Sequence, residues 1–192
     1  MASKDWIDIF QEKVMELNKE DDWQIEFDDS IKPNGIEPGW QQYITKAFAS
    51  FECSKCKRKW PSSRVMVVFH MNLWKRQRKG VVKVRWLCQN CKKCTAAPME
   101  KPTFSPDNLD ILLEKMIQKI RLMCYHETPD EVNRPFWTDP VRSPHEPAHC
   151  EACILGICTK NAPGQAVVAK NCIKVLDELL RLSLDELSLT EG

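Results

Sequence analysis

Closely spaced cysteine pairs constrain the fold of this chain more than any other feature of its sequence. Cys53 and Cys56 form one CxxC pair, and the segment CQNCKKC at 88–94 offers a second if Cys91 and Cys94 are taken as the pair. Two CxxC turns, each supplying two thiolates, are typical of a tetrahedral structural zinc site. Four protein ligands leave no position for a substrate, so such a site stabilises the fold. The spacing therefore predicts one Zn²⁺ bound by these two pairs.

The third cysteine of this segment, Cys88, complicates the choice of the second pair. Cys88 precedes Cys91 by the same interval that separates Cys91 from Cys94, so spacing alone permits either pair. Residues 81–88 alternate in the manner of a strand, which places Cys88 on the same face as the apolar Val82. We therefore expect Cys88 to be a core side chain, with the ligands at the turn beyond it. Reduced core cysteines and a redox dithiol are the competing interpretations, and the latter lacks a surrounding thioredoxin-like pattern.

Ten cysteines in 192 residues would also suit a disulfide-rich secreted protein. The N-terminal stretch 1–23 is charged throughout and lacks the apolar core of a signal peptide. A reducing compartment, in which clustered cysteines hold zinc, is therefore the better interpretation. No window approaches the length of apolar sequence that crosses a bilayer, so we expect no membrane-spanning segment in this chain.

A second group of metal-binding residues follows near the end of the chain. Three cysteines and a histidine between positions 145 and 158 have the spacing of a closed zinc site with one imidazole and three thiolate ligands. His149 and Cys124 are rival candidates for the fourth ligand, and His126 is a third. Because the segment follows a Pro-rich stretch, a metal-free segment that binds a partner is the alternative. The predicted second zinc set is His145, Cys150, Cys153 and Cys158.

Charge is strongly segregated along the chain. Residues 53–94 contain 13 Lys or Arg and no Asp or Glu, whereas 1–52 contain 5 basic and 12 acidic residues and 95–192 contain 10 and 15. A basic module between acidic flanks indicates an acidic partner, such as the cytosolic face of a membrane protein or an anionic membrane surface. The exposed turn KRQRKG at 75–80 and the strand after it carry much of this charge. The candidate binding residues are Lys75, Arg76, Arg78, Lys79, Lys83 and Arg85.

Basic and aromatic residues also interleave in this module, a pattern that suits RNA. Trp60, Trp74 or Trp86 would then stack on bases while the basic residues contact phosphates. Zinc-dependent RNA binding is therefore the alternative function, although no known RNA-recognition motif is present. The predicted zinc sites are fully ligated by protein, and no catalytic triad, carboxylate pair or phosphate loop is recognisable. We expect neither catalysis nor a small-molecule substrate.

The apolar pattern predicts an α+β fold. A small antiparallel sheet, essentially one long hairpin, forms the zinc module and is covered by N-terminal, central and C-terminal helices. The predicted helices are 3–19, 105–126 and 167–187, and the predicted strands are 23–29, 40–53, 64–74 and 81–88. We divide the chain into an N-terminal helix with strands (1–52), a zinc-binding core (53–126), a Pro-rich linker (127–144), the second Cys/His cluster (145–160) and an amphipathic helix (161–192).

Several segments together resemble one known family. FECSKCKRKWPSSRVMVVFHMNLW, QNCKKC, ILLEKMIQKI and above all HCEACILGIC are similar to the receptor-transporting proteins, whose zinc module is named for its three CxxC pairs (3CxxC). The resemblance runs from about Trp6 to Cys158. It places both predicted zinc sets on family ligand positions and leaves Cys88 outside them.

The resemblance implies a chaperone-like function without catalysis. Members of the family help G-protein-coupled receptors, including olfactory and taste receptors, to leave the endoplasmic reticulum and reach the plasma membrane. The implied partners are therefore G-protein-coupled receptors. Many members end in a hydrophobic membrane anchor, whereas this sequence ends in the charged, amphipathic KVLDELLRLSLDELSLTEG. We therefore expect a cytoplasmic protein that meets the endoplasmic reticulum or plasma membrane through its clients.

Overall fold

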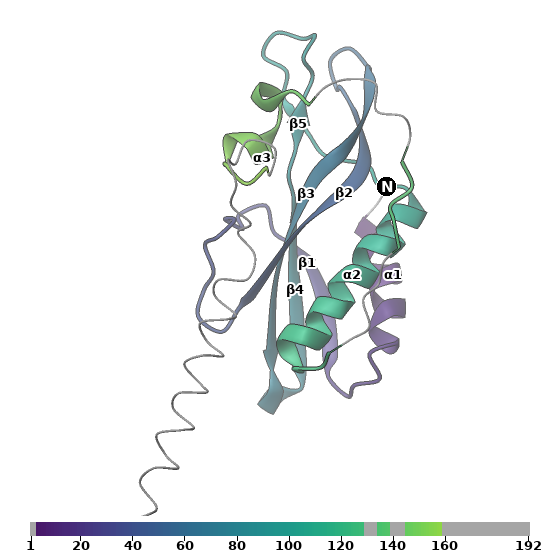
Figure 1. The fold of residues 1–192 in the computed structure, drawn as a ribbon, viewed down its shortest axis with the longest axis vertical. Helices are drawn as coiled ribbons and strands as arrows, with labels where there is room; N and C mark the ends of the chain where they lie inside the picture. The colour runs from purple at the N-terminus through teal and green to yellow at the C-terminus, as the bar shows by residue number, and fades with distance from the viewer. Residues whose placement is uncertain (1–2, 129–133, 139–144, 159–192) are drawn as a thin grey trace, which may run out of the picture. The chain divides into compact units, whose positions relative to one another are not determined.

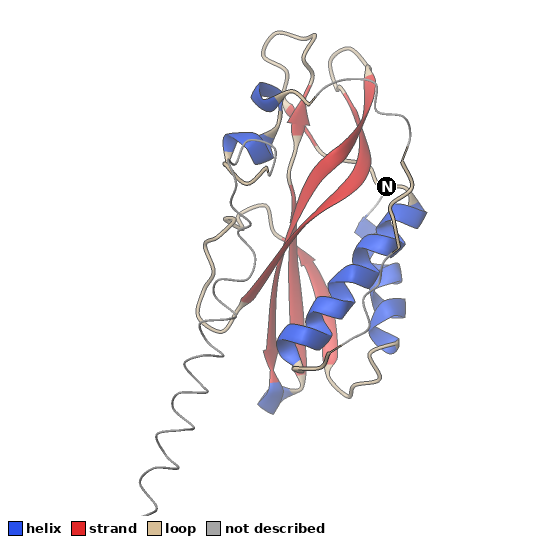
Figure 2. Ribbon diagram, viewed as in Figure 1, coloured by secondary structure: helices blue, strands red, loops and turns tan. Residues whose placement is uncertain are grey.

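Four strands form the central sheet, in the spatial order β1-β4-β3-β2 (Figures 1 and 2). The computed structural model describes residues 3–128, 134–138 and 145–158, and the predicted C-terminal helix lies outside these ranges. The strands are β1 (Asp22–Phe27), β2 (Gln41–Glu52), β3 (Lys59–Trp74) and β4 (Lys79–Trp86). Together with the helices described below, this sheet confirms the predicted α+β class.

The predicted hairpin is formed by β3 and β4, which are joined by the short 3-10 turn η1 (Lys75–Gln77). β3 begins at Lys59 rather than near Arg64, and so includes Pro61. A proline cannot donate to the hydrogen-bond ladder and is confined to strand edges. β4 pairs with β3 only from Val67 onward, so Pro61 lies where β3 has β2 as its one strand partner.

The sheet is mixed, whereas the sequence predicted an antiparallel one. β2, β3 and β4 pair antiparallel, but β1 lies parallel to β4 at the edge. The ring of Trp23, fully buried, covers Gly80 on the neighbouring strand. A Cβ atom at Gly80 would lie 2.2 Å from Cδ2 of Trp23, so this close approach requires glycine. The two residues are far apart in the chain, which is why local alternation gave no signal of the parallel pairing.

Two helices, α1 (Ser3–Met15) and α2 (Pro106–Cys124), lie on one side of the sheet (Figure 1). Ser105 caps α2 as predicted, since its side chain accepts a hydrogen bond from the backbone N–H of Asn108 (3.3 Å). Among the residues that the structure describes, no helix combines the length and the apolar character that crossing a bilayer requires. The helices contribute these side chains to the main core: Trp6, Phe10, Leu109, Leu112, Leu113, Met116, Ile117 and Ile120.

The opposite face of the sheet carries a smaller core. Strand alternation on β3 directs Val67 and Phe69 into the main core and Met66 to the other side, where it packs with Leu87 and Ala152. The short elements of this end of the molecule are β5 (Gln89–Asn90), β6 (Met99–Glu100), η2 (Pro147–His149) and α3 (Glu151–Ile154). In Figure 1, α3 accordingly lies across the sheet from α1 and α2.

Candidate metal centres

The first CxxC pair lies in the loop between β2 and β3, and the second lies between β5 and β6. A tight turn forms the first loop: Cys53 accepts a hydrogen bond from Lys57 N–H and donates its own N–H to the Arg58 carbonyl, both at 2.9 Å. The two loops meet at one end of the sheet, where the four sulfurs lie within 4.8 Å of one another. We call this set the four-cysteine cluster: Cys53, Cys56, Cys91 and Cys94.

The spacing of these sulfurs fits a tetrahedral zinc ion. Zn–S bonds of about 2.3 Å give a tetrahedron whose sulfur–sulfur edges are about 3.8 Å. The Sγ atoms of Cys53 and Cys94 are 3.9 Å apart, and those of Cys56 and Cys91 are 3.8 Å apart. A disulfide would require about 2.05 Å. The geometry therefore suits four thiolate ligands and excludes a disulfide bond between Cys53 and Cys94 or between Cys56 and Cys91.

Two thiols of the four-cysteine cluster, Cys91 and Cys94, have pKa values shifted in opposite directions. A hydrogen bond from the backbone N–H of Lys93 is the main reason that the pKa of Cys91 is lowered to about 6. Hydrogen bonding to Cys56, followed by burial and the other sulfurs, raises the pKa of Cys94 to about 12. Crowded thiolates repel one another, so full ionisation of the set requires a cation among them. A set of four cysteine donors is one that zinc favours in structural sites.

The second cluster gathers its residues around α3. Gly156 adopts a positive φ of 71°, which lets the chain reverse so that Cys158 N–H donates to the Ala152 carbonyl (3.1 Å). The His145 Nε2 atom lies 3.0 Å from Cys153 Sγ and 3.5 Å from Cys158 Sγ. The corresponding tetrahedral edge is about 3.6 Å for zinc bonds of about 2.05 and 2.3 Å. The Cys/His cluster consists of His145, Cys150, Cys153 and Cys158, whose ligand atoms lie within 4.8 Å of one another.

The structure keeps the rival fourth ligands away from this cluster. His149 Nδ1 is paired with Asn90 Oδ1 at 2.7 Å. Cys124 is buried in the main core at the end of α2, and His126 is exposed just beyond it. The imidazole that the structure places beside the three cysteines is therefore that of His145.

Hydrogen bonds and an ion pair with β4 hold the Cys/His cluster on the sheet. Cys150 forms an isolated antiparallel bridge with Gln89, and Glu151 N–H donates to the Cys88 carbonyl at 3.0 Å. The Glu151 carboxylate accepts the Cys88 N–H at 2.7 Å and pairs with the Arg85 guanidinium. Sequence reasoning missed Glu151, since a single glutamate beside a cysteine carries no recognisable signal.

Comparison with known proteins supports a zinc-binding fold. A family model described as a zinc-binding domain, of the 3CxxC zinc-ribbon type, matches residues 46–156. That range includes both CxxC pairs of the four-cysteine cluster and all of the Cys/His cluster except Cys158. With the donor geometry above, this match identifies Zn²⁺ as the cofactor of the chain.

Curated relatives define the family more narrowly. Mouse receptor-transporting protein 2 is 32% identical over 158 residues, which cover 82% of this chain and 71% of that protein. The chain belongs to the receptor-transporting protein family. Mouse receptor-transporting protein 3 is 36% identical over 166 residues, 85% of this chain but only 35% of that protein, and human receptor-transporting protein 4 is 32% identical over 155 residues, 80% of this chain and 63% of that protein. No solved structure shows a significant match.

Cys88 lies outside both clusters of this receptor-transporting protein family member. The expectation that it would be a core side chain is wrong, because β4 ends at Trp86 and Leu87 takes the buried position beside the smaller core. Cys88 is half-buried. Burial, followed by the nearby Glu151 carboxylate, raises its pKa to about 12. Cys88 is therefore a neutral thiol at neutral pH.

The six basic residues singled out from the sequence differ in their exposure. Four of them, Lys75, Arg76, Arg78 and Lys79, are exposed at the hairpin tip; Arg78 pairs with Glu20, and the other three form no ion pair with a residue that the structure describes. Trp74 lies next to them, is 38% exposed, and packs edge-on against Trp40 with ring centroids 5.8 Å apart. The tip therefore combines positive charge with an accessible aromatic ring.

The remaining two basic residues are half-buried and form ion pairs within the fold. Lys83 pairs with Asp28 at 3.1 Å. Arg85, as described above, holds the Cys/His cluster. The remaining two tryptophans of the proposed stacking set are partly buried against the main core: Trp60 and Trp86.

Proposed function

We propose that this chain is a zinc-stabilised accessory protein that binds receptors and promotes their transport to the plasma membrane. The observation that carries the proposal is the match of residues 46–156 to the 3CxxC zinc-binding domain, with both metal clusters assembled in the same fold. The curated relatives are named receptor-transporting proteins. We further propose G-protein-coupled receptors, including chemosensory ones, as the clients.

The eight residues of the two clusters act, in this proposal, as zinc ligands. Each set already supplies four protein donors, so the metal would have a structural role and no catalysis is proposed. When bound, the ion joins loops that the sheet alone would not hold together. Its contribution to receptor binding is thus to keep the binding surfaces of the fold in place.

The hairpin tip is the part of this fold that we propose to contact the membrane beside a client receptor. The cytosolic leaflet carries a negative surface potential, and juxtamembrane basic residues each gain about 1 kcal/mol near it. Lys75, Arg76 and Lys79 are exposed there, and tryptophan is enriched at membrane interfaces. Trp74 would therefore add an interfacial contact to the electrostatic one.

Surface delivery of a receptor tests the proposal directly. A G-protein-coupled receptor with an extracellular epitope is expressed with or without the chain and labelled on intact cells. We expect the chain to raise surface labelling and Cys53→Ser/Cys91→Ser to abolish the increase. Lys75→Ala/Arg76→Ala/Lys79→Ala should reduce it, whereas an equal loss of exposed charge elsewhere should not. Unchanged labelling, together with no co-precipitation of the receptor, would contradict the proposal. The matched charge control is Lys4→Ala/Lys32→Ala/Lys46→Ala.

RNA binding at the same tip is the second candidate, favoured by the exposed charges beside Trp74. Binding of a labelled single-stranded RNA should then fall steeply with salt and be lost in a variant without the tip charges. Tight binding by this variant would rule out the tip as the RNA site. The variant is Lys75→Ala/Arg76→Ala/Arg78→Ala/Lys79→Ala.

A further inference from the structure

A short segment without regular secondary structure, residues 134–138, is held against α2. We call it the strap. Asn108, which is 2% exposed, donates from Nδ2 to the Trp137 carbonyl (2.9 Å) and accepts the Trp137 N–H at Oδ1 (2.8 Å). Both backbone groups of one residue are thus paired by one amide side chain, as a neighbouring β-strand would pair them. Such a contact recognises a peptide backbone and does not depend on which side chain stands at the position of Trp137.

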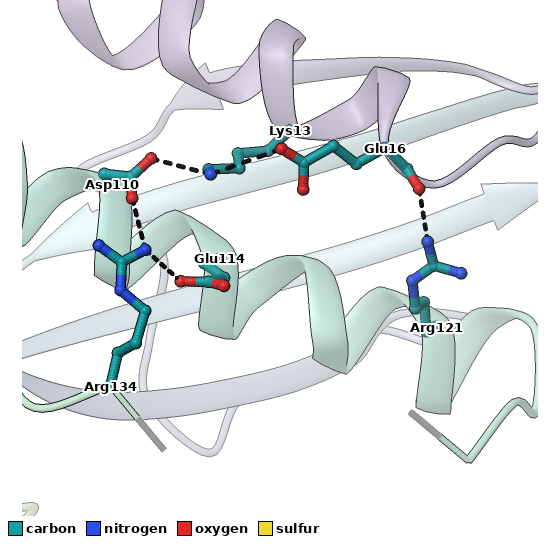
Figure 3. A network of polar contacts seen from close by, with 6 residues as sticks. All are labelled: Lys13, Glu16, Asp110, Glu114, Arg121 and Arg134. Carbon is teal, nitrogen blue, oxygen red and sulfur yellow. Dashed lines mark hydrogen bonds and ion pairs between the residues drawn. The ribbon is translucent and has the colours of Figure 1, made fainter. Parts of the chain in front are cut away.

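The first residue of the strap sits at an acidic site on the same helix. Arg134 Nη1 lies 2.8 Å from Asp110 Oδ2 and 2.7 Å from Glu114 Oε2 (Figure 3). Asp110 also pairs with Lys13 of α1 at 2.9 Å, which fixes the carboxylate from the other side. Two carboxylates one helical turn apart therefore select a cation at this position.

The third residue of the strap supplies an apolar contact. Phe136 packs against the main core, and the Lys115 ammonium lies 4.8 Å from its ring centroid. Trp137, in contrast, is 70% exposed, and the hydrogen bonds that join it to α2 are made by its backbone. The α2 surface thus recognises a cation, an aromatic ring two residues later, and the backbone of the residue after that.

We propose that this face of α2 is a binding surface for an extended peptide with arginine two residues before an aromatic residue, and that the strap occupies it in cis. The inference rests on the proposed function, because the ligand would be such a segment of a client receptor. The Arg134 side chain remains 49% exposed and the Asn108 contact reads only backbone, so a segment of the same chemistry can make every contact that the strap makes. Because the strap belongs to the same chain, its effective concentration at this surface is high, and it therefore occupies the surface when no other peptide is present.

A labelled peptide with the strap sequence VNRPFWTDP tests the surface by fluorescence anisotropy. The protein is the zinc-loaded full chain carrying Arg134→Ala/Phe136→Ala, which removes the two side-chain anchors of its own strap. We expect saturable binding to this variant at least tenfold tighter than to the unmodified chain, in which the strap competes. Circular dichroism and zinc stoichiometry verify that the variant is folded.

Peptide variants make the test independent of protein folding. Replacing the peptide arginine or phenylalanine by alanine should weaken binding at least tenfold, whereas replacing its exposed tryptophan should leave it unchanged. On the protein, Lys115→Ala should weaken binding, and Lys119→Ala, one turn along the same helix, should not, because Lys119 lies over Tyr43 instead. Absence of saturable binding, or equal binding of all the peptides, would overturn the proposal.

This test separates the inference from the function on which it rests. Receptor capture and surface delivery by a chain that binds none of the peptides would overturn the α2 surface and leave the proposed function standing. Peptide binding with the expected specificity, by a chain that neither captures nor delivers receptors, would support the surface and overturn its assignment to receptor clients.

Discussion

The two metal clusters each bring four protein ligands together, but they draw these ligands from different parts of the chain. The four-cysteine cluster draws its residues from two loops that are remote in the chain, 53–56 and 91–94, and the β3–β4 hairpin lies between them. The Cys/His cluster takes all its residues from the single segment 145–158, which docks on the sheet from outside. The first cluster is therefore part of the sheet, and the second is a local module attached to it.

This difference predicts unequal consequences when the two clusters lose metal. Zinc-binding free energies of about 10–16 kcal/mol in small domains are comparable with the ~5–15 kcal/mol stability of a whole domain. In the four-cysteine cluster that energy closes a long loop, and the buried Cys53 and Cys91 link it to the sheet. In the Cys/His cluster, zinc binding closes only a short loop, and none of the residues of this loop belongs to the main core described above. We therefore expect the main core to persist when this cluster loses its metal.

Breaking the four-cysteine cluster should have the largest effect. We expect Cys91→Ser to lose at least one of two zinc ions by native mass spectrometry and to abolish cooperative thermal unfolding. Cys88→Ser, the same substitution three positions earlier, is the matched control and should retain both ions. A Cys91→Ser chain with two zinc ions and an unchanged Tm would show that this cluster does not organise the sheet.

Breaking the Cys/His cluster should have a smaller, local effect. His145→Ala should lower the zinc stoichiometry from two to one while the far-ultraviolet circular dichroism of the sheet and helices persists. Hydrogen exchange should accelerate within 145–158 and not in β3. His149→Ala, which removes the contact with Asn90, should keep two ions. Retention of two ions by His145→Ala would remove this histidine from the ligand set.

Detaching the second module without removing its metal would sharpen the comparison. Glu151→Gln removes a charge from a largely buried pair, since the Glu151 and Arg85 side chains are 20% and 17% exposed. We expect a loss of about 1–3 kcal/mol in urea unfolding with both zinc ions retained. Lys92→Ala breaks the more exposed pair with Glu146 and should cost less than about 1 kcal/mol. Equal losses in the two variants would show that the Glu151 contact does not hold the module.

The smallest effect concerns the thiol between the clusters. Burial raises the folded-state pKa of Cys88 to about 12 from 9.0. The neutral thiol therefore contributes to the free energy of unfolding at neutral pH, and this contribution is lost as the pH rises from about 9 to about 12. At pH 8 the thiolate fraction is about 10³-fold lower than for an ordinary thiol. Alkylation of Cys88 in the zinc-loaded chain, followed by peptide mass spectrometry, should be correspondingly slow. Labelling as fast as that of a free thiol would contradict the raised pKa of Cys88.

Local patterns in the sequence predicted the parts of this fold that depend on neighbouring residues. The hairpin, the Ser105 cap and the CxxC turns each need only a few consecutive positions. The parallel pairing of β1, the Glu151–Arg85 contact and the strap join residues that are remote in the chain. The misplacement of Cys88 has another cause, since alternation was extended past the residue at which β4 ends.

The length of strand β3 also sets the distance between the four-cysteine cluster and the hairpin tip. Its 16 residues run from Lys59, just after the first cysteine pair, to Trp74 at the hairpin tip, a length of about 50 Å at ~3.3 Å per residue. Within the regular part of the strand, residues 65–74, deleting two residues would shorten this spacing by about 7 Å and preserve which side chains face the core, whereas deleting one would exchange the two faces beyond the deletion. The register of β3 already shifts by one residue opposite Ala47 and Ala49 of β2, so a single-residue change in the separation between the four-cysteine cluster and the basic tip can be accommodated at that bulge but not within residues 65–74.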